Sequence, residues 1–311
     1  MNCSICGSKA VIDCKYEGKS YCKKHFLIKF EKKVRKTIRV NNLIEKGDRI
    51  AVAISGGKDS STMLSILRNI TKDRTDVSIF AITIDEGIKG YRGKTIRDAK
   101  KFCSSLGVEL HIGSFEDLIG ISTDDVVKKN DDDTLKACTF CGVFRRDCIN
   151  KLAAKHGANK VAIGHNLDDE AQSIMANYIR GDMLRAVRIG PKSFIVEDKR
   201  FVPRIKPLRD VLEQEVALFA LLKEFPLSFG ECPYADESFR WEIRDLINSL
   251  EQNHPGTKHS IVATFDSMLP YLKSGYFKKV GTIIKKCTTC GGPTSQKYCK
   301  VCILKKKVGL V

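Results

Sequence analysis

A continuously apolar run that passes into a glycine-rich turn constrains the fold of this chain more than any other feature. Ile50-Ala51-Val52-Ala53-Ile54 carries no polar residue, as expected of a strand covered on both faces. Ser55-Gly56-Gly57-Lys58-Asp59-Ser60-Ser61 follows, and a helical pattern then runs over residues 59–71. Further strands are expected at Val77–Ile84, Val108–Gly113 and Lys160–Gly164, alternating with helices at 92–106 and near 140–157. This alternation predicts an α/β protein with a doubly wound parallel sheet.

The turn after the first strand has the chemistry of an anion-binding nest. It lacks the spacing of a Walker A loop, but two glycines let backbone N–H groups approach a phosphate where a helix begins. Ligands of such sheets bind at the carboxyl ends of the strands. We therefore expect Ser55, Gly56, Gly57 and Ser60 to cradle a phosphate chain, to which Lys58 would add a compact positive charge.

Paired cysteines at both ends of the chain predict metal sites. Cys3, Cys6, Cys22 and His25 have the spacing of a closed tetrahedral zinc site, and Cys287, Cys290, Cys299 and Cys302 form a second set. Segments this short cannot build a core alone, so both zinc ions are expected to be structural. Cys14, Cys103 and Cys148 are interpreted as packing residues.

The net charge lies entirely in two peripheral segments. Residues 23–49 carry ten basic and three acidic side chains, and residues 273–311 carry ten lysines and no acid, which accounts for the formal net charge of +17. Such segments are often solvated faces, but this confinement favours a surface that binds a polyanion. A basic helix is expected around residues 26–46. Its candidate contacts are Lys29, Lys32, Lys33, Arg35, Lys36 and Arg39.

Cys138, Cys141 and Cys232 belong to no set of four ligands. Three thiolates leave one coordination position open, which suits a [4Fe–4S] cluster better than a closed zinc site. In a competing mechanism, Cys138 carries a persulfide that Cys232 resolves as a disulfide, or the reverse. The first two cysteines are expected just before a helix, and Arg145 lies one turn beyond Cys141, where it could reach phosphates or remain a surface arginine.

Seven motifs in order resemble those of the PP-loop ATP pyrophosphatases, and among them the archaeal and eukaryotic cytosolic tRNA 2-thiolation proteins, the TtuA and NcsA group. The motifs are the N-terminal zinc ligands, the S-G-G-x-D-S loop, Ile84-Asp85-Glu86-Gly87, Cys138-x-x-Cys141-Gly142, Gly164-His165-Asn166, Cys232-Pro233-Tyr234 and the terminal four cysteines. The resemblance implies a PP-loop (adenine nucleotide alpha hydrolase-like) sheet flanked by N- and C-terminal zinc fingers. It also implies that ATP adenylates the C2 oxygen of a tRNA uridine and that sulfur then displaces AMP. In the family the three remaining cysteines hold a [4Fe–4S] cluster.

This chemistry suggests roles for the residues at the strand ends. Backbone groups of Ala53 and Ile84 would hold adenine, and Asp59 would position Mg²⁺ or a hydroxyl group, unless it only satisfies the helix dipole. Arg145 would contact the phosphates, and Gly164 would let the nucleotide approach closely. Asp169 is a further nucleotide or metal candidate, or simply an acid at a helix start, as are Asp168 and Glu170.

The expected organisation is a zinc finger at 1–27, a basic connector at 28–47, the ATP-binding catalytic domain at 48–280 and a second zinc finger at 281–311. No apolar window is long enough to span a membrane, and no leader segment is seen, so a cytoplasmic enzyme is expected. The expected partners are tRNA, a sulfur donor (sulfide or a ubiquitin-like thiocarboxylate carrier) and a second copy of the chain.

The reaction expected from the resemblance is ATP-dependent 2-thiolation of tRNA, with wobble position 34 favoured over position 54. Two other classes compete with it. A non-enzymatic, zinc-dependent RNA-binding protein leaves the loop and the three cysteines unexplained. A synthetase acting on a small metabolite predicts neither the basic stripe nor the paired zinc modules.

Overall fold

The structure is a computed structural model that describes residues 1–132, 135–193, 201–226, 232–234, 239–280 and 285–310. Among the described helices, none combines the length and apolar composition that a membrane span requires.

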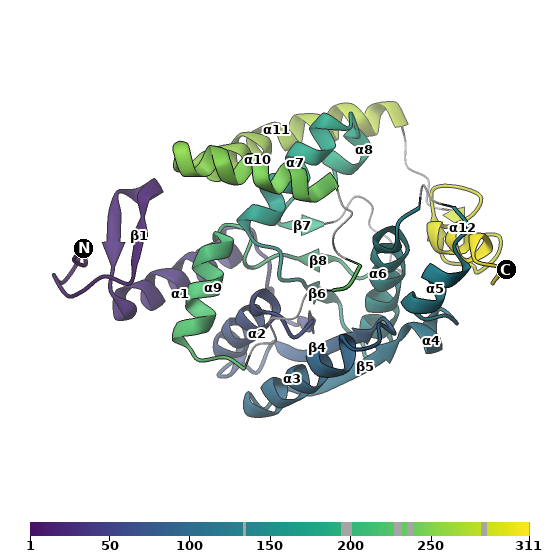
Figure 1. The fold of residues 1–311 in the computed structure, drawn as a ribbon, viewed down its shortest axis with the longest axis horizontal. Coiled ribbons are helices and arrows are strands. Elements are labelled where there is room, and N and C mark those ends of the chain that lie inside the picture. Colours follow the sequence, from purple (N-terminus) through teal and green to yellow (C-terminus); the bar gives the residue numbers. More distant parts are fainter. Residues whose placement is uncertain (133–134, 194–200, 227–231, 235–238, 281–284, 311) are drawn as a thin grey trace.

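A six-stranded sheet organises the molecule (Figure 1). In spatial order its strands are β5 (Leu110–Ser114), β4 (Ser78–Asp85), β3 (Arg49–Ala53), β6 (Lys160–Ala162), β8 (Arg204–Ile205) and β7 (Lys192–Ser193). The first five are parallel, and β7 pairs antiparallel with β8 at the edge. Strand order runs outward in both directions from β3, so the topological switch point lies between β3 and β6. The predicted doubly wound parallel sheet is confirmed.

Helices cover both faces of this sheet (Figure 1). Their bounds are α2 Lys58–Thr71, α3 Arg92–Ser105, α4 Phe115–Leu118, α5 Thr123–Lys129, α6 Ala137–Lys155, α7 Leu167–Ile179, α8 Met183–Ala186, α9 Glu213–Leu222, α10 Phe239–Asn253 and α11 Thr257–Val280. The sequence predicted a helix start at residues 168–170, which is the start of α7, but it did not predict α4, α5, α8 to α11, β7 or β8. The expectation that Cys138 and Cys141 precede a helix is wrong, because both lie in the first turns of α6. The first turn of α6 has no acidic residue, and no side chain caps this helix, so the sequence gives no signal for where the helix begins.

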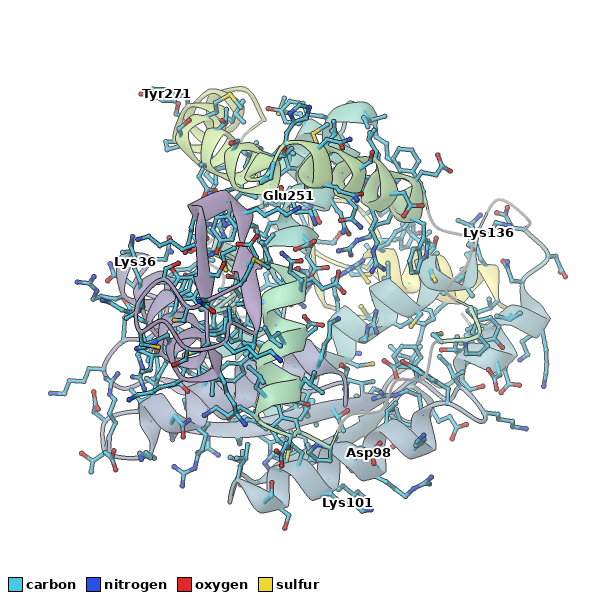
Figure 2. All side chains as sticks on the ribbon, turned by 60° about the vertical axis from the view of Figure 1, so that its left-hand side comes forward. Lys36, Asp98, Lys101, Lys136, Glu251 and Tyr271 are labelled. Atoms are coloured by element: carbon cyan, nitrogen blue, oxygen red, sulfur yellow. The ribbon has the colours of Figure 1, made fainter. Side chains whose placement is uncertain are left out.

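The N-terminal segment forms a small hairpin, β1 (Ile12–Cys14) and β2 (Lys19–Tyr21), around the short 3₁₀ turn η1 (Lys15–Glu17). It leads into α1 (Lys23–Val40), which ends six residues earlier than expected because Asn42 adopts a positive φ of 47°. Basic residues of α1 such as Lys36 project from the periphery (Figure 2). At the other end of the chain lie β9 (Lys285–Lys286), β10 (Pro293–Thr294) and α12 (Lys300–Lys307).

The two terminal modules lie at opposite ends of the molecule (Figure 1). Of the predicted domain boundaries, the one at residue 281 lies outside the described residues, and those at 28 and 48 stay predictions.

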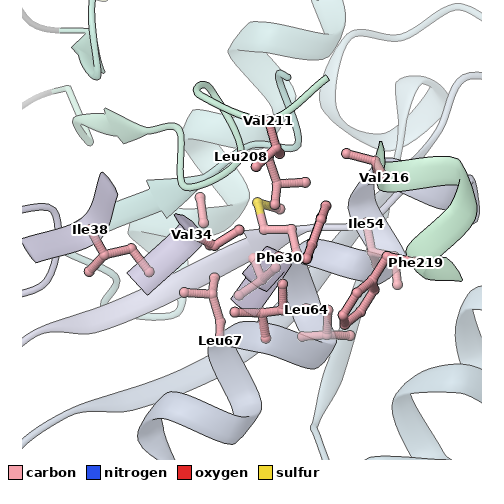
Figure 3. Close-up of a cluster of buried hydrophobic side chains, with 14 of the residues drawn as sticks. Phe30, Val34, Ile38, Ile54, Leu64, Leu67, Leu208, Val211, Val216 and Phe219 are labelled. Carbon is pink, nitrogen blue, oxygen red and sulfur yellow. The ribbon is translucent and has the colours of Figure 1, made fainter. Parts of the chain in front are cut away.

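Three buried clusters hold these layers together. Alternate residues of β3 explain the first two: Ile50 and Val52 point into a core with α1, α2, α3 and α9, whereas Ala51 points toward α4, α5, α6 and α12. Figure 3 shows the first core, where Phe30 stacks on Phe219 with ring centroids 4.4 Å apart. The third cluster joins α7, α10 and α11. Because Ile50, Ala51 and Val52 of β3 are buried between two helical layers, this part of the strand is apolar on both faces.

Candidate functional site

A cavity of about 790 Å³ opens where β3, β4 and β6 end. This position beside the switch point is where doubly wound sheets bind ligands. Most of the predicted nucleotide and cysteine residues line it: Ala53, Ser55, Asp59, Ser60, Ile84, Cys138, Cys141, Arg145, Gly164, Asp169 and Cys232. Gly56, Gly57 and Lys58 do not line it. One cavity thus brings together residues from distant parts of the chain.

The glycine-rich turn has the backbone of a nest. Gly56 has a φ of 89°, and a Cβ there would lie 2.6 Å from the Thr95 carbonyl oxygen, so only glycine fits. Gly57 is the N-cap of α2, and Asp59 and Ser60 in the first turn of this helix line the cavity. The Ser60 hydroxyl accepts from the Ser55 N–H (3.1 Å) and donates to the Gly57 carbonyl (3.0 Å), so it holds the loop in shape.

Asp59 lies among groups that hold its carboxylate in place. Asn166 Nδ2 donates to Asp59 Oδ1 at 3.0 Å, and Lys58 Nζ lies 3.2 Å from its Oδ2. Burial raises the pKa of Asp59 above its ordinary value, despite the nearby Lys58 charge. Lys58 also pairs with Glu213 at 2.9 Å. Two carboxylates therefore share one lysine beside the loop. Carboxylate oxygens are ligands that Mg²⁺ takes, and Lys58 neutralises them in the structure.

Gly164 and Asp169 occupy the next strand end. The predicted strand 160–164 stops at Ala162, and a Cβ on Gly164 would lie 3.1 Å from backbone atoms of Asp59 and Ser60. The missing side chain thus lets this segment pass against the start of α2. Asp169 forms a capping box with Asn166 at the start of α7 and bonds to Arg240. Burial opposes its ionisation, but His165, Arg240 and the Asn166 N–H lower the pKa of Asp169.

Arg92 and Glu86 are site residues for which the sequence analysis assigned no role. The Arg92 guanidinium, almost fully buried, donates to the carbonyl oxygens of Ser55 (3.0 Å) and Ile84, and its Nε lies 2.5 Å from Glu86 Oε2. The other Glu86 oxygen lies 3.5 Å from Arg145 Nη1. The Ile84 carbonyl oxygen therefore already accepts a hydrogen bond from Arg92 in the nucleotide-free protein. Glu86 stands in the quoted motif at 84–87, whereas Arg92 had no signal in the sequence.

Cys138, Cys141 and Cys232 line one part of the cavity, with Arg145 close by. The Cys138 thiol donates to the Tyr234 carbonyl at 3.1 Å, which ties α6 to the segment containing Cys232. Burial raises the pKa of the Cys141 thiol to about 11, although Arg145 acts in the opposite direction. The three sulfurs are not as tightly grouped as the terminal ligand sets. Their convergence in one cavity beside a guanidinium nonetheless fits a group that takes three thiolates.

Both terminal sets have the geometry of a metal site. Within each set all four ligand atoms lie within 4.8 Å of one another. The Cys6 and Cys22 sulfurs are 3.8 Å apart and those of Cys290 and Cys299 3.6 Å, close to the edge of about 3.8 Å of a tetrahedron with Zn–S bonds of about 2.3 Å. Backbone N–H groups of Cys299 and Cys290 lower the pKa of the Cys287 thiol to about 6, which favours the thiolate form.

The six basic residues proposed on α1 fall into two groups. Lys29 and Lys33 are partly buried and pair with Glu215 at 2.9 and 3.4 Å, so their charges are used inside the protein. Lys32, Arg35, Lys36 and Arg39 are exposed and have no ion pair with a described acidic side chain. The structure therefore leaves four of the six available to a polyanion.

Comparisons with known proteins agree along the whole chain. Residues 26–247 match the PP-loop domain family, and residues 2–27 match the N-terminal LIM domain of 2-thiouridine synthetase TtuA. The tRNA 2-thiolation protein NcsA of Haloferax volcanii is 38% identical over the full length of both chains. Cytoplasmic tRNA 2-thiolation protein 1 of Caenorhabditis briggsae is 36% identical over 96% of this chain and 78% of its own. The solved structure of the U34-tRNA thiolase NcsA from Methanococcus maripaludis, with its [4Fe-4S] cluster, matches with a TM-score of 0.85 and 37% identity, covering 100% of this chain and 97% of that one.

Proposed function

The chain belongs to the NcsA-type tRNA 2-thiolation proteins of the PP-loop family, and we propose that it converts a tRNA uridine to 2-thiouridine at the expense of ATP. The observation that carries the proposal is the cavity whose lining combines Ser55, Asp59 and Ser60 of the glycine-rich turn with the three cysteines Cys138, Cys141 and Cys232. A nucleic-acid-binding protein without catalysis needs neither.

The first half-reaction uses the turn and the strand ends. Adenine would lie over the ends of β3 and β4, near Ala53 and Ile84, with its phosphates at the start of α2. The uridine C2 oxygen attacks the α-phosphorus of ATP, the bond to the β-phosphate oxygen breaks, and pyrophosphate leaves. Asp59, with Glu213 beside it, would hold the Mg²⁺ that neutralises the departing charge.

Arg145 is placed between the two halves of the chemistry. Its guanidinium lies at hydrogen-bonding range from Glu86 and close to the cysteines, and its side chain is half exposed to the cavity. It could therefore contact the α-phosphate, where negative charge is greatest in the transition state.

The second half-reaction replaces AMP by sulfur. Cys138, Cys141 and Cys232 would hold a [4Fe–4S] cluster, and when bound it would supply an iron with an open position for an external sulfur atom. The C2–sulfur bond forms as the C2–oxygen bond to AMP breaks. The cavity walls would keep water away from the adenylated uridine, because water would otherwise hydrolyse this intermediate.

The remaining parts of the proposal concern partners and place. The solved relative, a U34-tRNA thiolase, supports position 34 over position 54 as the target. The sulfur donor would be sulfide or a thiocarboxylate carrier protein, and the two terminal sets would each bind one structural zinc. The name of the C. briggsae relative supports a cytoplasmic location, and a homodimer stays a prediction from the sequence.

Two measurements on anaerobically purified protein test this function. Exchange of labelled pyrophosphate into ATP should require unmodified tRNA, and supplying sulfide should then yield 2-thiouridine detected by mass spectrometry of the digested tRNA. Cys138→Ala, Cys141→Ala and Cys232→Ala should each abolish 2-thiouridine while tRNA-dependent exchange continues. Cys103→Ala, at a buried cysteine of α3, is the matched control and should retain both activities.

Two outcomes would contradict the proposal. Exchange that is independent of tRNA would indicate a synthetase for a small metabolite. Full thiolation by iron-free protein would reject the cluster and support a persulfide on Cys138 or Cys232.

A further inference from the structure

A second cavity of about 370 Å³ adjoins the nucleotide cavity. The two share lining residues His165, Gln172, Lys206 and Arg240, so they form adjoining compartments. The second compartment is built by the end of α7, by α8 and by the start of α10. Its volume lies within the usual range of ligand pockets, roughly 300–1,000 Å³. Nothing in the proposed mechanism so far uses it.

The two compartments differ in charge. Asp59, Glu86, Asp169 and Glu213 line the first cavity together with its arginines. The described residues that line the second include four arginines and one lysine but no acidic side chain; the cations are Arg180, Arg185, Arg188, Arg240 and Lys206. A mixed lining suits a metal-bound triphosphate, whereas a cationic lining suits anions that bring no metal.

Three of these cations are not neutralised by a buried acidic side chain of the part of the chain that the structure describes. Lys206 pairs with the buried Glu170, and Arg240 binds Asp169, so both are engaged. Among the described acidic residues, Arg185 pairs with Asp182 alone, in an exposed (i, i+3) contact that contributes little stability. Arg188 is exposed and has no ion pair with a described acidic residue. Arg180 stacks its guanidinium on Phe239 at 4.4 Å, which leaves its in-plane N–H groups for a ligand.

The positive region continues from this compartment into the first. Arg146 and Arg204 line the nucleotide cavity, and Arg204 donates to the Arg146 carbonyl at 3.0 Å. Neither has an ion pair with a described carboxylate. Burial, followed by repulsion from Arg145 and Arg185, lowers the pKa of Arg146. Guanidinium groups held together against their own repulsion are stabilised when an anion binds among them.

We propose that the second cavity is the subsite for backbone phosphates of the tRNA strand next to the target uridine, contacted by Arg180, Arg185 and Arg188. The uridine itself would then enter the nucleotide cavity past His165 and Gln172. This inference rests on the proposed function and adds to it the place where the substrate strand is held. RNA fits better than a protein tail, because successive phosphodiesters match several arginines while a carrier would bring one carboxylate.

Unmodified tRNA transcript and ATP are the probes for the test. Arg185→Ala/Arg188→Ala should weaken tRNA binding at least about tenfold and reduce the slope of log affinity against log salt by about 1.5, the value for two lost phosphate contacts. Arg185→Lys/Arg188→Lys should restore the slope, since a phosphate contact needs mainly the charge. ATP affinity should stay unchanged in both variants.

A charge-matched control lies on α3, on the opposite side of the molecule from α8 (Figure 1). Arg97→Ala/Lys101→Ala removes two exposed cations there and should alter the slope by less than one contact does. Thermal melting should confirm that all variants fold.

The possible results separate this inference from the proposed function. If the parent protein binds no tRNA, both are overturned. If the parent binds tRNA but the alanine variant keeps its affinity and slope, only this inference falls. If the variant keeps tRNA binding and adenylation but fails with a thiocarboxylate carrier while sulfide still works, the cavity receives a carrier tail, which also overturns it.

Discussion

Glu86 lies between two arginines that come from different helices of the cavity wall. One oxygen is 2.5 Å from Arg92 and the other 3.5 Å from Arg145, and the carboxylate is 6% exposed. Arg92 in turn binds the carbonyls of Ser55 and Ile84. Glu86 therefore fixes Arg92, which holds the glycine-rich loop in shape, and it lies beside Arg145, the arginine that we propose to contact a phosphate.

Removing Glu86 should cost stability as well as activity. Glu86→Ala leaves the buried Arg92 charge without its partner, so the free energy of unfolding should fall by about 3 kcal/mol. Urea unfolding followed by circular dichroism measures this. Glu109→Ala, at a position whose side chain is 67% exposed, is the control and should change stability by less than about 0.5 kcal/mol. A loss that small in Glu86→Ala would mean that Arg92 is held by its other partners.

Asp59 should make stability depend on pH in a direction unusual for a carboxylate. Burial raises its pKa above the ordinary value of 3.8, so the folded protein binds this proton more tightly than the unfolded chain does. Its contribution to stability therefore falls as pH rises from 3.8 through the raised pKa. Asp59→Asn cannot ionise and should be more stable than the parent at pH 7, with the advantage lost below pH 3.8.

Thermal melts of nucleotide-free protein at pH 3.5 and pH 7, compared with Asp73→Asn at an exposed turn, would test this. The same Asp59 variant should lower tRNA adenylation by about 100-fold, a usual cost of losing one electrostatic contact to the transition state. A variant with normal adenylation would show that Asp59 only satisfies the dipole of α2.

At the scale of elements, α1 has two faces with different tasks. Lys29 and Lys33 are turned toward Glu215, whose exposure is 1%, and Tyr16 completes this buried group. The Lys29 and Lys33 charges, together with Tyr16, lower the pKa of Glu215 to about 2, although burial alone would raise it. The exposed face, which includes Lys36 at the periphery in Figure 2, carries the other cations.

Substitutions on the exposed face should affect tRNA binding but not stability, whereas substitutions on the buried face should affect stability. Changing Lys32, Arg35, Lys36 and Arg39 to Gln should reduce the salt slope of tRNA binding by up to about 3 and leave stability unchanged. Lys29→Gln should instead lower the free energy of unfolding by about 2 kcal/mol, because Glu215 loses a charged hydrogen-bond donor. Filter binding over a salt series and urea unfolding measure the two effects. An unchanged slope in the four-residue variant would show that this face is merely solvated.

On the scale of the whole molecule, both terminal modules are attached to the central body. Tyr16 stacks on His259 of α11 with ring centroids 4.3 Å apart. At the other end, Leu304 and Val308 enter the core beside α6, and Lys307 pairs with Asp132 at 2.6 Å. Loss of the metal from either terminal module should therefore also destabilise the central body of the protein.

Zinc removal should show this attachment. The parent should contain two zinc ions per chain by elemental mass spectrometry, and Cys6→Ser and Cys290→Ser should each contain one. Each variant should also melt at a lower temperature than the parent, because metal binding contributes folding energy. Two zinc ions in either variant, or an unchanged melting temperature, would show that the corresponding site is not structural.

Local patterns in the sequence were enough for four of the six strands of the sheet, for the loop and for the two terminal ligand sets. A strand buried on both faces must be apolar throughout, and a metal set needs fixed spacing, so both leave a readable signal in Ile50–Ile54 and in Cys287, Cys290, Cys299 and Cys302. The family resemblance of the motifs is confirmed by matches that cover the whole chain. The roles of the individual nucleotide and cysteine residues stay predictions.

Only the tertiary structure decided which charged side chains are neutralised inside the protein and which are exposed to a ligand. Lys29 and Lys36 look alike in the sequence, but Glu215 on α9, far along the chain, neutralises one and not the other. No sequence motif predicted the role of Arg92 or the cationic cavity beside α8. Both depend on groups that only folding brings together, namely backbone carbonyls around Arg92 and several arginines around the cavity. The metal ligands of a short module can be read from their spacing in the sequence, because they are close along the chain. Ion pairs cannot be read in this way, because their strength depends on the distance between the charges in the folded protein.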